Sequence, residues 1–201
     1  MNKQKLIEKF DKQSAIYEEN TRKRMMGSWR KRLLEGVQGD VLEIAVGAGA
    51  NFPYYDMDRV RLSAADFSPM MLQRARRIAD ELNLQVTLIE SDIETLDFPA
   101  HSFDSVVSTL SLCGYDDPKQ VLRNIGRWCK PGGQVYLLEH GLGRNPFFKS
   151  AQRLLNPAAR KISGCNWNRD IEQIVRNSGL QIEHMERYWN GMIHLIWARS
   201  V

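Results

Sequence analysis

The chain has 201 residues, of which 43% are hydrophobic and 26% charged, and this length and composition are typical of one folded α/β domain. No apolar stretch of about 18 residues occurs and none follows the basic N-terminus, so we expect neither a transmembrane helix nor a secretory signal. The three cysteines are far apart and form no Cys-x-x-Cys pair. Their spacing argues against a disulfide framework and against a metal site, and it indicates a cytoplasmic protein.

The net charge of +4 is unevenly distributed along the chain. Residues 1–35 carry a balance of +5 and residues 144–169 a balance of +6, so the remainder carries −7. Two basic segments on an acidic body favour contact with an anionic partner, either a lipid surface or a nucleic acid. The alternative is that both segments are solvated helix faces.

Apolar periodicity and turn residues divide the chain into alternating helices and strands. Helices are predicted at 3–36, 68–82, 117–129, within 144–169 and at 171–177. Strands are predicted at 41–46, 60–65, 85–90, 105–110 and 134–139, with a turn at 130–133. A final hairpin is predicted to join 180–188 to 192–198 through Asn190 and Gly191.

This order of elements predicts an α/β fold with a doubly wound, mostly parallel, seven-stranded sheet and a C-terminal antiparallel hairpin. No internal repeat or low-complexity linker divides the chain, so residues 1–201 are expected to form a single domain. In such folds, ligands bind at the carboxyl ends of the strands, where the strand order reverses.

A glycine-rich turn follows the first predicted strand, in the pattern Glu43-x-Ala45-x-Gly47-x-Gly49. Glycines there let the backbone turn tightly and approach a ligand without Cβ atoms in the way. The turn alone is a weak signal, because several nucleotide cofactors use similar loops.

Three observations favour S-adenosylmethionine (SAM) over a dinucleotide as the ligand of this turn. The dinucleotide fingerprint needs a small residue three positions after the second glycine, and Phe52 stands there. The carboxylate of Glu43 would repel a pyrophosphate but can accept from an ammonium group, directly or through water. Asp66 ends the second strand nineteen residues after Gly47, a spacing that suits a carboxylate accepting both ribose hydroxyls.

Further candidates follow the second and third strands. Asp92 can accept from an adenine amino group, while Phe67 and Ile93 can enclose the ring. Each acidic residue also has a purely structural interpretation, because Glu43 could pair with a surface lysine and Asp92 could cap a turn. Their joint placement at the ends of successive strands favours the ligand site.

These residues resemble the class I SAM-dependent methyltransferases from about Phe10 to Ala198. The matching segments are VLEIAVGAGAN (41–51), AADFSPMMLQRAR (64–76), ESDIETLDFPAHSFDSVVSTLSLCG (90–114) and RWCKPGGQVYLLEHG (127–141). The resemblance implies the Rossmann-like fold of that family, SAM as cofactor and S-adenosylhomocysteine as product. It adds five residues to the expected cofactor pocket: Tyr17, Asn51, Met71, Thr109 and Leu110.

Within that family, the chain looks most like a subgroup of bacterial phosphatidylethanolamine N-methyltransferases and membrane-associated thiol S-methyltransferases of animals. The segments that carry this likeness are LSLCG (110–114), LLEHG (137–141) and NPFFKSAQRLLNP followed by GCNWNRD (164–170). Quinone C-methyltransferases are similar over FDKQSAIYE (10–18). The acceptor atom therefore stays open among lipid nitrogen, thiol sulfur, and the carbon or oxygen of a quinone or phenol.

Two residues depart from the pattern of these relatives. Ala45 stands where many members have glycine, which we interpret as a small loss because alanine is still compact. Asn166 stands where the subgroup usually has histidine. If that histidine contacts substrate in the relatives, the acceptor of this chain differs from theirs.

Methyl transfer from a sulfonium mainly requires alignment of acceptor, methyl group and sulfur, and it needs a base only if the acceptor must lose a proton. Glu139 and His140, at the end of the fifth strand, are the expected catalytic pair, with histidine as the base. The alternative is that His140 only binds loop backbone. Cys113 has no basic neighbour in its motif and is expected to pack in the core.

The resemblance implies that residues 1–36 form a helical lid and residues 144–169 an insertion near the acceptor. Both segments combine basic and apolar residues, which favours peripheral contact with an anionic membrane and a small-molecule or lipid acceptor. The competing interpretation is that both apolar stripes pack onto the sheet. Two rival functions remain: a nucleic-acid methyltransferase, disfavoured because no Asn-Pro-Pro-Tyr or Asp-Pro-Pro-Tyr motif occurs, and a SAM-binding protein without catalysis.

Overall fold

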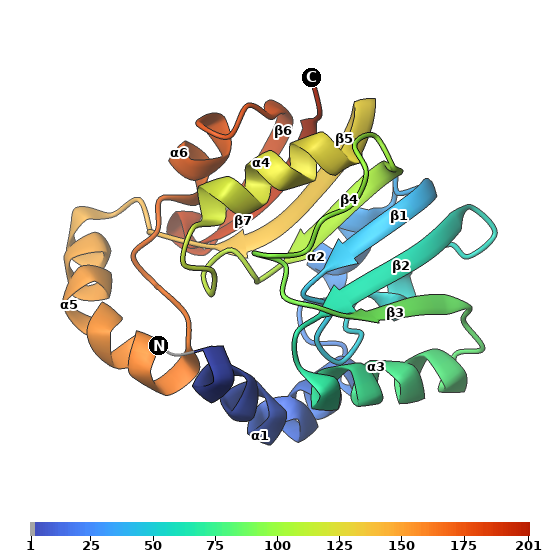
Figure 1. The fold of residues 1–201 in the computed structure, drawn as a ribbon. Helices are drawn as coiled ribbons and strands as arrows, with labels where there is room; N and C mark the ends of the chain where they lie inside the picture. Colours follow the sequence, from blue (N-terminus) through green and yellow to red (C-terminus); the bar gives the residue numbers. More distant parts are fainter. Residues whose placement is uncertain (1–2) are drawn as a thin grey trace.

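The computed structural model describes residues 3–201, so residues 1 and 2 of the expected lid lie outside the described part. Helices cover both faces of a central twisted sheet (Figure 1). The helices are α1 (Lys3–Arg22), α2 (Gly27–Leu34), α3 (Pro69–Glu81), α4 (Pro118–Trp128), α5 (Pro146–Ser163) and α6 (Ile171–Arg176). The strands are β1 (Gly39–Ile44), β2 (Val60–Asp66), β3 (Val86–Glu90), β4 (Phe103–Thr109), β5 (Cys129–His140), β6 (Gln181–Tyr188) and β7 (Ile193–Arg199). None of the described helices combines the length and apolar character needed to cross a membrane.

The strands of the described chain form one seven-stranded sheet in the order β3-β2-β1-β4-β5-β7-β6. Strands β1 to β5 pair in parallel, whereas β7 runs antiparallel to both β5 and β6. The predicted doubly wound sheet with a C-terminal antiparallel hairpin is therefore confirmed. The strand order reverses between β1 and β4, which places the expected ligand site at the carboxyl ends of these two strands.

The sequence pattern explains why these segments pack as they do. Successive residues of a strand face opposite sides of a sheet. In β1, Val41 packs in one core with α2 and α3, while Leu42 packs in the other with α4 and α6. The predicted helix starts are also confirmed: the Ser68 side chain accepts from Met71 N at the start of α3, and Asp117 caps α4 in the same way.

Several boundaries differ from the prediction, among them the first strand, predicted at 41–46 and observed at Gly39–Ile44. The expected helix at 3–36 is two helices, because Arg24 and Met26 adopt left-handed backbone conformations (φ of 51° and 57°) between α1 and α2. The expected turn at 130–133 lies inside β5 as an irregular stretch. Successive pairs between β4 and β5 join Phe103 to Cys129 and Ser105 to Gln134, so β5 has extra residues between them. The hairpin connection between β6 and β7 spans Trp189–Met192 and includes the predicted Asn190 and Gly191.

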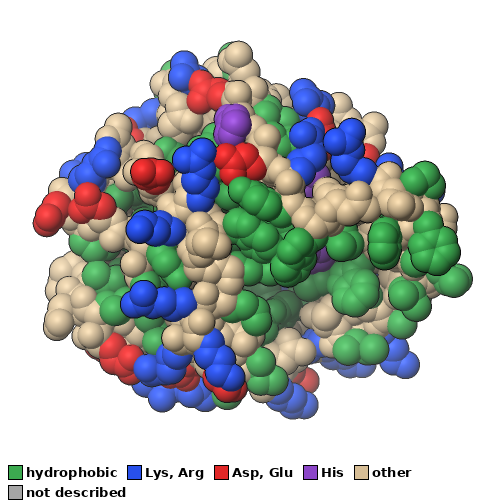
Figure 2. Space-filling model, turned by 180° about the vertical axis from the view of Figure 1, so that it is seen from behind, with side chains coloured by type: hydrophobic (Ala, Val, Ile, Leu, Met, Phe, Trp, Pro, Cys, Tyr) green, Lys and Arg blue, Asp and Glu red, His purple; other side chains and the backbone are tan. Residues whose placement is uncertain are grey.

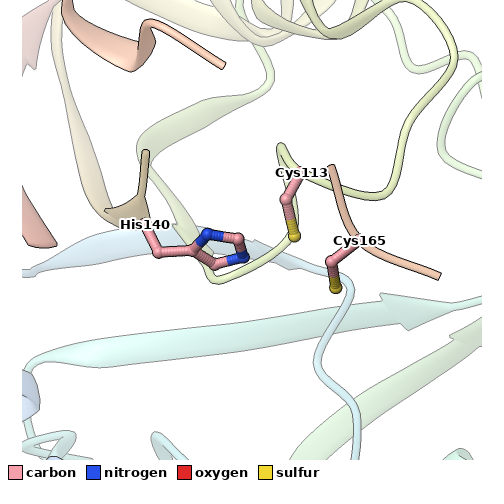
Figure 3. Close-up of side chains that lie close together, drawn as sticks. All are labelled: Cys113, His140 and Cys165. Atoms are coloured by element: carbon pink, nitrogen blue, oxygen red, sulfur yellow. The ribbon is translucent and has the colours of Figure 1, made fainter. Parts of the chain in front are cut away.

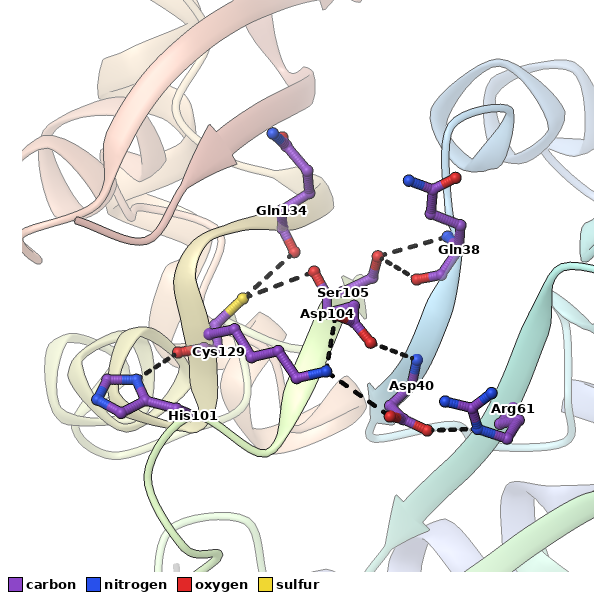
Figure 4. A network of polar contacts seen from close by, with 9 residues as sticks. Gln38, Asp40, Arg61, His101, Asp104, Ser105, Cys129 and Gln134 are labelled. Atoms are coloured by element: carbon purple, nitrogen blue, oxygen red, sulfur yellow. Dashed lines mark hydrogen bonds and ion pairs between the residues drawn. The ribbon is translucent and has the colours of Figure 1, made fainter.

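A polar network ties the amino ends of the central strands together, at the edge opposite the expected site (Figure 4). Asp104 at the start of β4 accepts from Asp40 N at 2.8 Å and from Lys130 Nζ at 2.8 Å. Asp40 in turn binds Arg61 Nε of β2 at 2.7 Å. The network therefore links β1, β2, β4 and the irregular stretch of β5.

We predict that Asp104→Ala lowers the free energy of unfolding by about 1–2 kcal/mol, because it leaves Asp40 N without an acceptor and Lys130 with only its 3.7 Å contact to Asp40. The effect is moderated by the 37% exposure of this side chain. Lys130 lowers the pKa of Asp104. The contribution of Asp104 to stability is therefore fully present above the ordinary aspartate pKa, and it is lost as the pH falls through the lowered pKa. Urea denaturation at several pH values measures both effects.

Asp97→Ala is the matched control, because Asp97 makes an ion pair with Arg127 but is 71% exposed. We expect a smaller change in the denaturation midpoint for this variant. An equal loss in both variants would contradict the assigned role of the network.

Candidate functional site

A cavity of about 250 Å³ opens at the carboxyl ends of the parallel strands, as the strand order predicts. Its wall includes loop residues after β1, β2 and β4 and the last residue of β5, together with side chains from α1 and α2. Of the predicted site residues, it is lined by Tyr17, Ala45, Gly47, Asp66, Phe67, Met71, Thr109, Leu110 and His140. The other predicted residues, Glu43, Gly49, Asn51, Asp92, Ile93 and Glu139, lie behind or beside this wall.

The glycine-rich turn forms one side of the cavity. Gly47 and Gly49 have φ values of 55° and 77°, which are strained for any residue with a side chain. A Cβ at Gly47 would enter the space in front of Tyr17, 3.8 Å from its ring. A Cβ at Gly49 would meet Phe52 at 2.6 Å. The buried Phe52 ring therefore occupies the space beside the turn, while Gly47 keeps the cavity side free.

Asp66 holds this turn against the end of β2. Its carboxylate accepts from Gly47 N and from Ser68 N, both at 2.9 Å. Burial raises the pKa of Asp66 to about 6, and the backbone hydrogen bonds partly oppose that rise. The residue thus presents a well-positioned carboxyl group to the cavity.

A buried network lies behind the turn. Glu43 accepts from Asn51 Nδ2 at 2.9 Å and from the Tyr55 hydroxyl at 2.8 Å, so the alternative pairing with a surface lysine does not occur. Arg30 of α2 donates to Asn51 Oδ1 at 2.6 Å and to Thr109 Oγ1 at 3.0 Å. Burial raises the pKa of Glu43 to about 7. Through Arg30, which lines the cavity, this network supplies a cation next to the turn.

The α1 helix covers the part of the cavity near β2 and β3. Phe10 packs edge-on against Phe67, with ring centroids 5.5 Å apart. Lys3 binds Asp92 at 2.6 Å, and Asp92 also accepts from Glu94 N, so the turn-capping interpretation of Asp92 is satisfied as well. Ile93 is buried in the core under α4.

The two predicted catalytic residues occupy different positions. Glu139 is fully buried and accepts from Ser108 Oγ at 2.9 Å and from the backbone of Ser111 and Leu112, both at 3.2 Å. Burial raises the pKa of Glu139 to about 7. Its oxygens bind the loop after β4, whereas the ring of His140 reaches the cavity wall.

Sequence reasoning missed the neighbours of His140. Cys113 and Cys165 lie beside it at the cavity wall, and the three side chains point toward one another (Figure 3). The hydrogen bond from Cys113, together with His140, lowers the pKa of the Cys165 thiol, while the same pair interaction and burial raise the pKa of Cys113. No sequence signal joins them, because 27 and 25 residues separate the three positions along the chain.

Comparison with known proteins agrees with this geometry. A family model described as a methyltransferase domain matches residues 42–137. The phosphatidylethanolamine N-methyltransferase of Cereibacter sphaeroides is 32% identical over 148 residues, which cover 72% of this chain and 71% of that protein. The chain belongs to the class I SAM-dependent methyltransferases. SAM is accordingly its cofactor.

Two further similarities define how far the likeness extends. The mitochondrial methyltransferase OMS1 of Saccharomyces cerevisiae is 30% identical over 194 residues, 87% of this chain, but the chain spans only 41% of that protein. A SAM-dependent methyltransferase structure from Aquifex aeolicus matches with a TM-score of 0.71 at 14% identity, covering 95% of this chain and 98% of that one. The structural match shows the shared fold.

The residues of this methyltransferase fit the cofactor. Gly47 leaves open the space that a Cβ would fill, and Asp66 offers a carboxylate beside it. The Tyr115 hydroxyl, in the cavity wall, is buried and has no hydrogen-bond partner within the described chain. A ligand with several polar groups would satisfy such a wall.

Ala45 is less neutral than its small size suggests, because its φ of 50° lies in the left-handed region. We predict that Ala45→Gly raises the free energy of unfolding by about 0.5–1 kcal/mol. Glycine removes the strain of the left-handed backbone, and this gain exceeds the loss from the greater conformational entropy of glycine in the unfolded chain. Ala48→Gly, in the same turn but without a positive φ, should instead lower it. Thermal denaturation of both variants provides the measurement, and equal effects would contradict the strain at Ala45.

We predict that Asp66→Asn weakens SAM binding by about 1–3 kcal/mol, because an amide cannot accept from two hydroxyls while also holding the turn. Wild-type affinity should fall as the pH drops below about 6, where Asp66 takes up a proton. Calorimetry at pH 5.5 and 7.5 measures both effects. Glu43 titrates in both proteins, so subtracting the pH dependence of Asp66→Asn from that of the wild type leaves the contribution of Asp66. Asp80→Asn, on the exposed face of α3, is the control. A pH dependence of SAM affinity as large in Asp66→Asn as in the wild type would argue against this assignment.

Proposed function

We propose that the chain transfers the methyl group of SAM to a small or lipid-like acceptor that it takes from an anionic membrane surface. The acceptor of first choice is the nitrogen of phosphatidylethanolamine. The observation that carries this proposal is the row of exposed apolar side chains on α5, beside the cavity. Figure 2 shows hydrophobic side chains gathered around a hollow and along the neighbouring edge of the molecule.

The α5 helix supports the membrane interpretation through its burial pattern. Phe147, Leu154 and Ile162 are 77%, 82% and 74% exposed, and Ala159 is the only residue of α5 that is buried. The competing interpretation, in which the apolar stripe packs onto the sheet, therefore does not apply to α5. It does apply to α2, where Leu33 is fully buried and Trp29 packs against the same core.

The basic residues of α5 add an electrostatic contribution to such contact. An amphipathic helix with lysine and arginine at its edges binds an interface through apolar burial and through attraction to anionic headgroups. Residues 144–169 contain six basic and no acidic side chains. The N-terminal lid packs beside this helix, since Lys9 Nζ donates to Lys161 O at 2.8 Å. An acceptor that leaves the membrane next to α5 is thus close to the cavity.

We propose the following roles for residues in and beside the cavity. SAM, when bound, supplies an activated methyl group. Asp66 accepts hydrogen bonds from the ribose hydroxyls, Phe67 contacts the adenine ring, and Asp92, beside the cavity wall, accepts from the adenine amino group. Tyr17 covers the cavity from α1 and excludes water. His140, the predicted catalytic residue that lines the cavity, takes up the proton that an amine acceptor loses. Glu139 positions the loop after β4.

We predict that the double substitution Phe147→Ser and Leu154→Ser reduces binding to anionic vesicles at least about tenfold, because two large apolar side chains no longer enter the interface. Co-sedimentation with vesicles of phosphatidylethanolamine and phosphatidylglycerol measures binding. Release of S-adenosylhomocysteine on the same vesicles measures turnover. SAM affinity should remain unchanged, since α5 does not line the cofactor side of the cavity.

Leu82→Ser, an exposed leucine at the end of α3, is the control and should leave vesicle binding unchanged. Binding that does not depend on anionic lipid would contradict the membrane surface. A small thiol and a quinol serve as the alternative acceptors in the turnover assay. SAM binding without turnover on any acceptor would favour the protein that binds SAM without catalysis.

A further inference from the structure

Three metal-ligating side chains converge at the cavity wall from distant parts of the chain. Cys113 follows β4, His140 ends β5 and Cys165 follows α5. Their ligand atoms all lie within 4.8 Å of one another (Figure 3). Within the part of the chain that the structure describes, this is the one group of three such residues close enough to share an ion.

The distances suit one ion after a small adjustment. Zinc binds thiolate sulfur at about 2.3 Å and imidazole nitrogen at about 2.0–2.1 Å in tetrahedral geometry, which puts neighbouring ligand atoms about 3.6–3.8 Å apart. Ligand atoms already within 4.8 Å of one another need to approach by only about 1 Å to reach this separation.

The backbone holds the two cysteines together without help from an ion. Asn166 donates to the Cys113 carbonyl through its backbone N at 2.9 Å and through its side-chain Nδ2 at 3.0 Å. Cys165 N donates to Ser163 Oγ at 3.2 Å. Arg169 donates to the carbonyls of Leu112 and Tyr115 and so fixes the loop on either side of Cys113. The ligand positions are therefore built into the fold.

We propose that Cys113, His140 and Cys165 bind one zinc ion, with its fourth coordination position facing the cavity. Thiolate and imidazole ligands favour zinc over calcium and magnesium, which take oxygen ligands. Three protein ligands and one open position are the arrangement of catalytic rather than structural zinc sites. All three residues line the cavity, so the fourth position opens to an incoming molecule. The wide spacing of the cysteines, which argued against a metal site, rules out only local ligand motifs.

With zinc bound, the open position favours a thiol as the methyl acceptor in place of the phosphatidylethanolamine nitrogen. This consequence rests on the proposed methyl transfer, not on that first choice of acceptor. A thiol that binds zinc replaces a water molecule and loses its proton to solvent, which leaves a metal-bound thiolate. An imidazole nitrogen bound to the ion no longer takes up a proton, so the ion would replace His140 as the group that activates the acceptor. A phospholipid amine gains no such activation.

Metal binding can be tested on the full-length protein without cofactor or acceptor. The reduced, metal-free protein is titrated with Co²⁺, whose thiolate complexes absorb in the near ultraviolet and visible, and Zn²⁺ is then used to displace it. We expect one ion per chain. Cys113→Ser, Cys165→Ser and His140→Ala should each weaken binding more than about 100-fold, beyond the loss typical of residues outside the ligand set.

Cys129→Ser is the matched control, because Cys129 is buried at the far end of β5 against Asp104 and should leave the metal spectrum unchanged. The proposal would be overturned if the protein, with Cys113 and Cys165 reduced, takes up no ion. It would also be overturned if the three ligand variants bind the ion as the wild type does.

Calorimetry with SAM, in the presence and absence of zinc, separates the zinc site from the proposed methyl transfer. SAM binding without metal binding overturns the zinc site alone, while metal binding without SAM binding overturns the proposed methyl transfer.

Discussion

Three buried carboxyl groups at the carboxyl ends of the strands determine the shape of the site. Glu43 and Glu139 lie next to the last residues of β1 and β5, Asp66 ends β2, and each is at most 5% exposed. Burial of a carboxyl group is costly unless loop donors satisfy it. Each group therefore binds the loop that follows its own strand or a neighbouring strand, and these loops form the cavity wall. The cavity is a consequence of satisfying the carboxyl groups.

The same burial makes the site sensitive to protons. The pKa values of Glu43, Asp66 and Glu139 are raised to about 7, 6 and 7, mainly because burial disfavours the charged form. A raised folded pKa stabilises the fold at low pH and loses that contribution as the pH rises through the raised value. Near neutrality these carboxyl groups therefore carry less negative charge than their residue types suggest. A cationic ligand such as SAM would favour the ionised forms.

Most of the fold and the cofactor side could be predicted from sequence, because their signals are local. Strand periodicity, the glycine turn and the caps at Ser68 and Asp117 depend on neighbouring residues. The break between α1 and α2 carries no comparable signal, since Arg24 and Met26 adopt left-handed conformations that are uncommon for their residue types. Arg30 was missed for a related reason: a basic residue in a basic helix looks solvated until tertiary packing buries it at the site.

The acceptor side could not be predicted in this way, because it exists only through contacts between distant segments. Asn166, in the segment after α5, donates hydrogen bonds to the Cys113 carbonyl in the loop after β4, and these bonds hold Cys165 next to Cys113. The position where the resembling subgroup usually has histidine thus holds two loops together in this chain. A change there would move the cysteines relative to His140 and leave Asp66 and the glycine turn in place. The acceptor can therefore diverge within this fold while the cofactor site is retained.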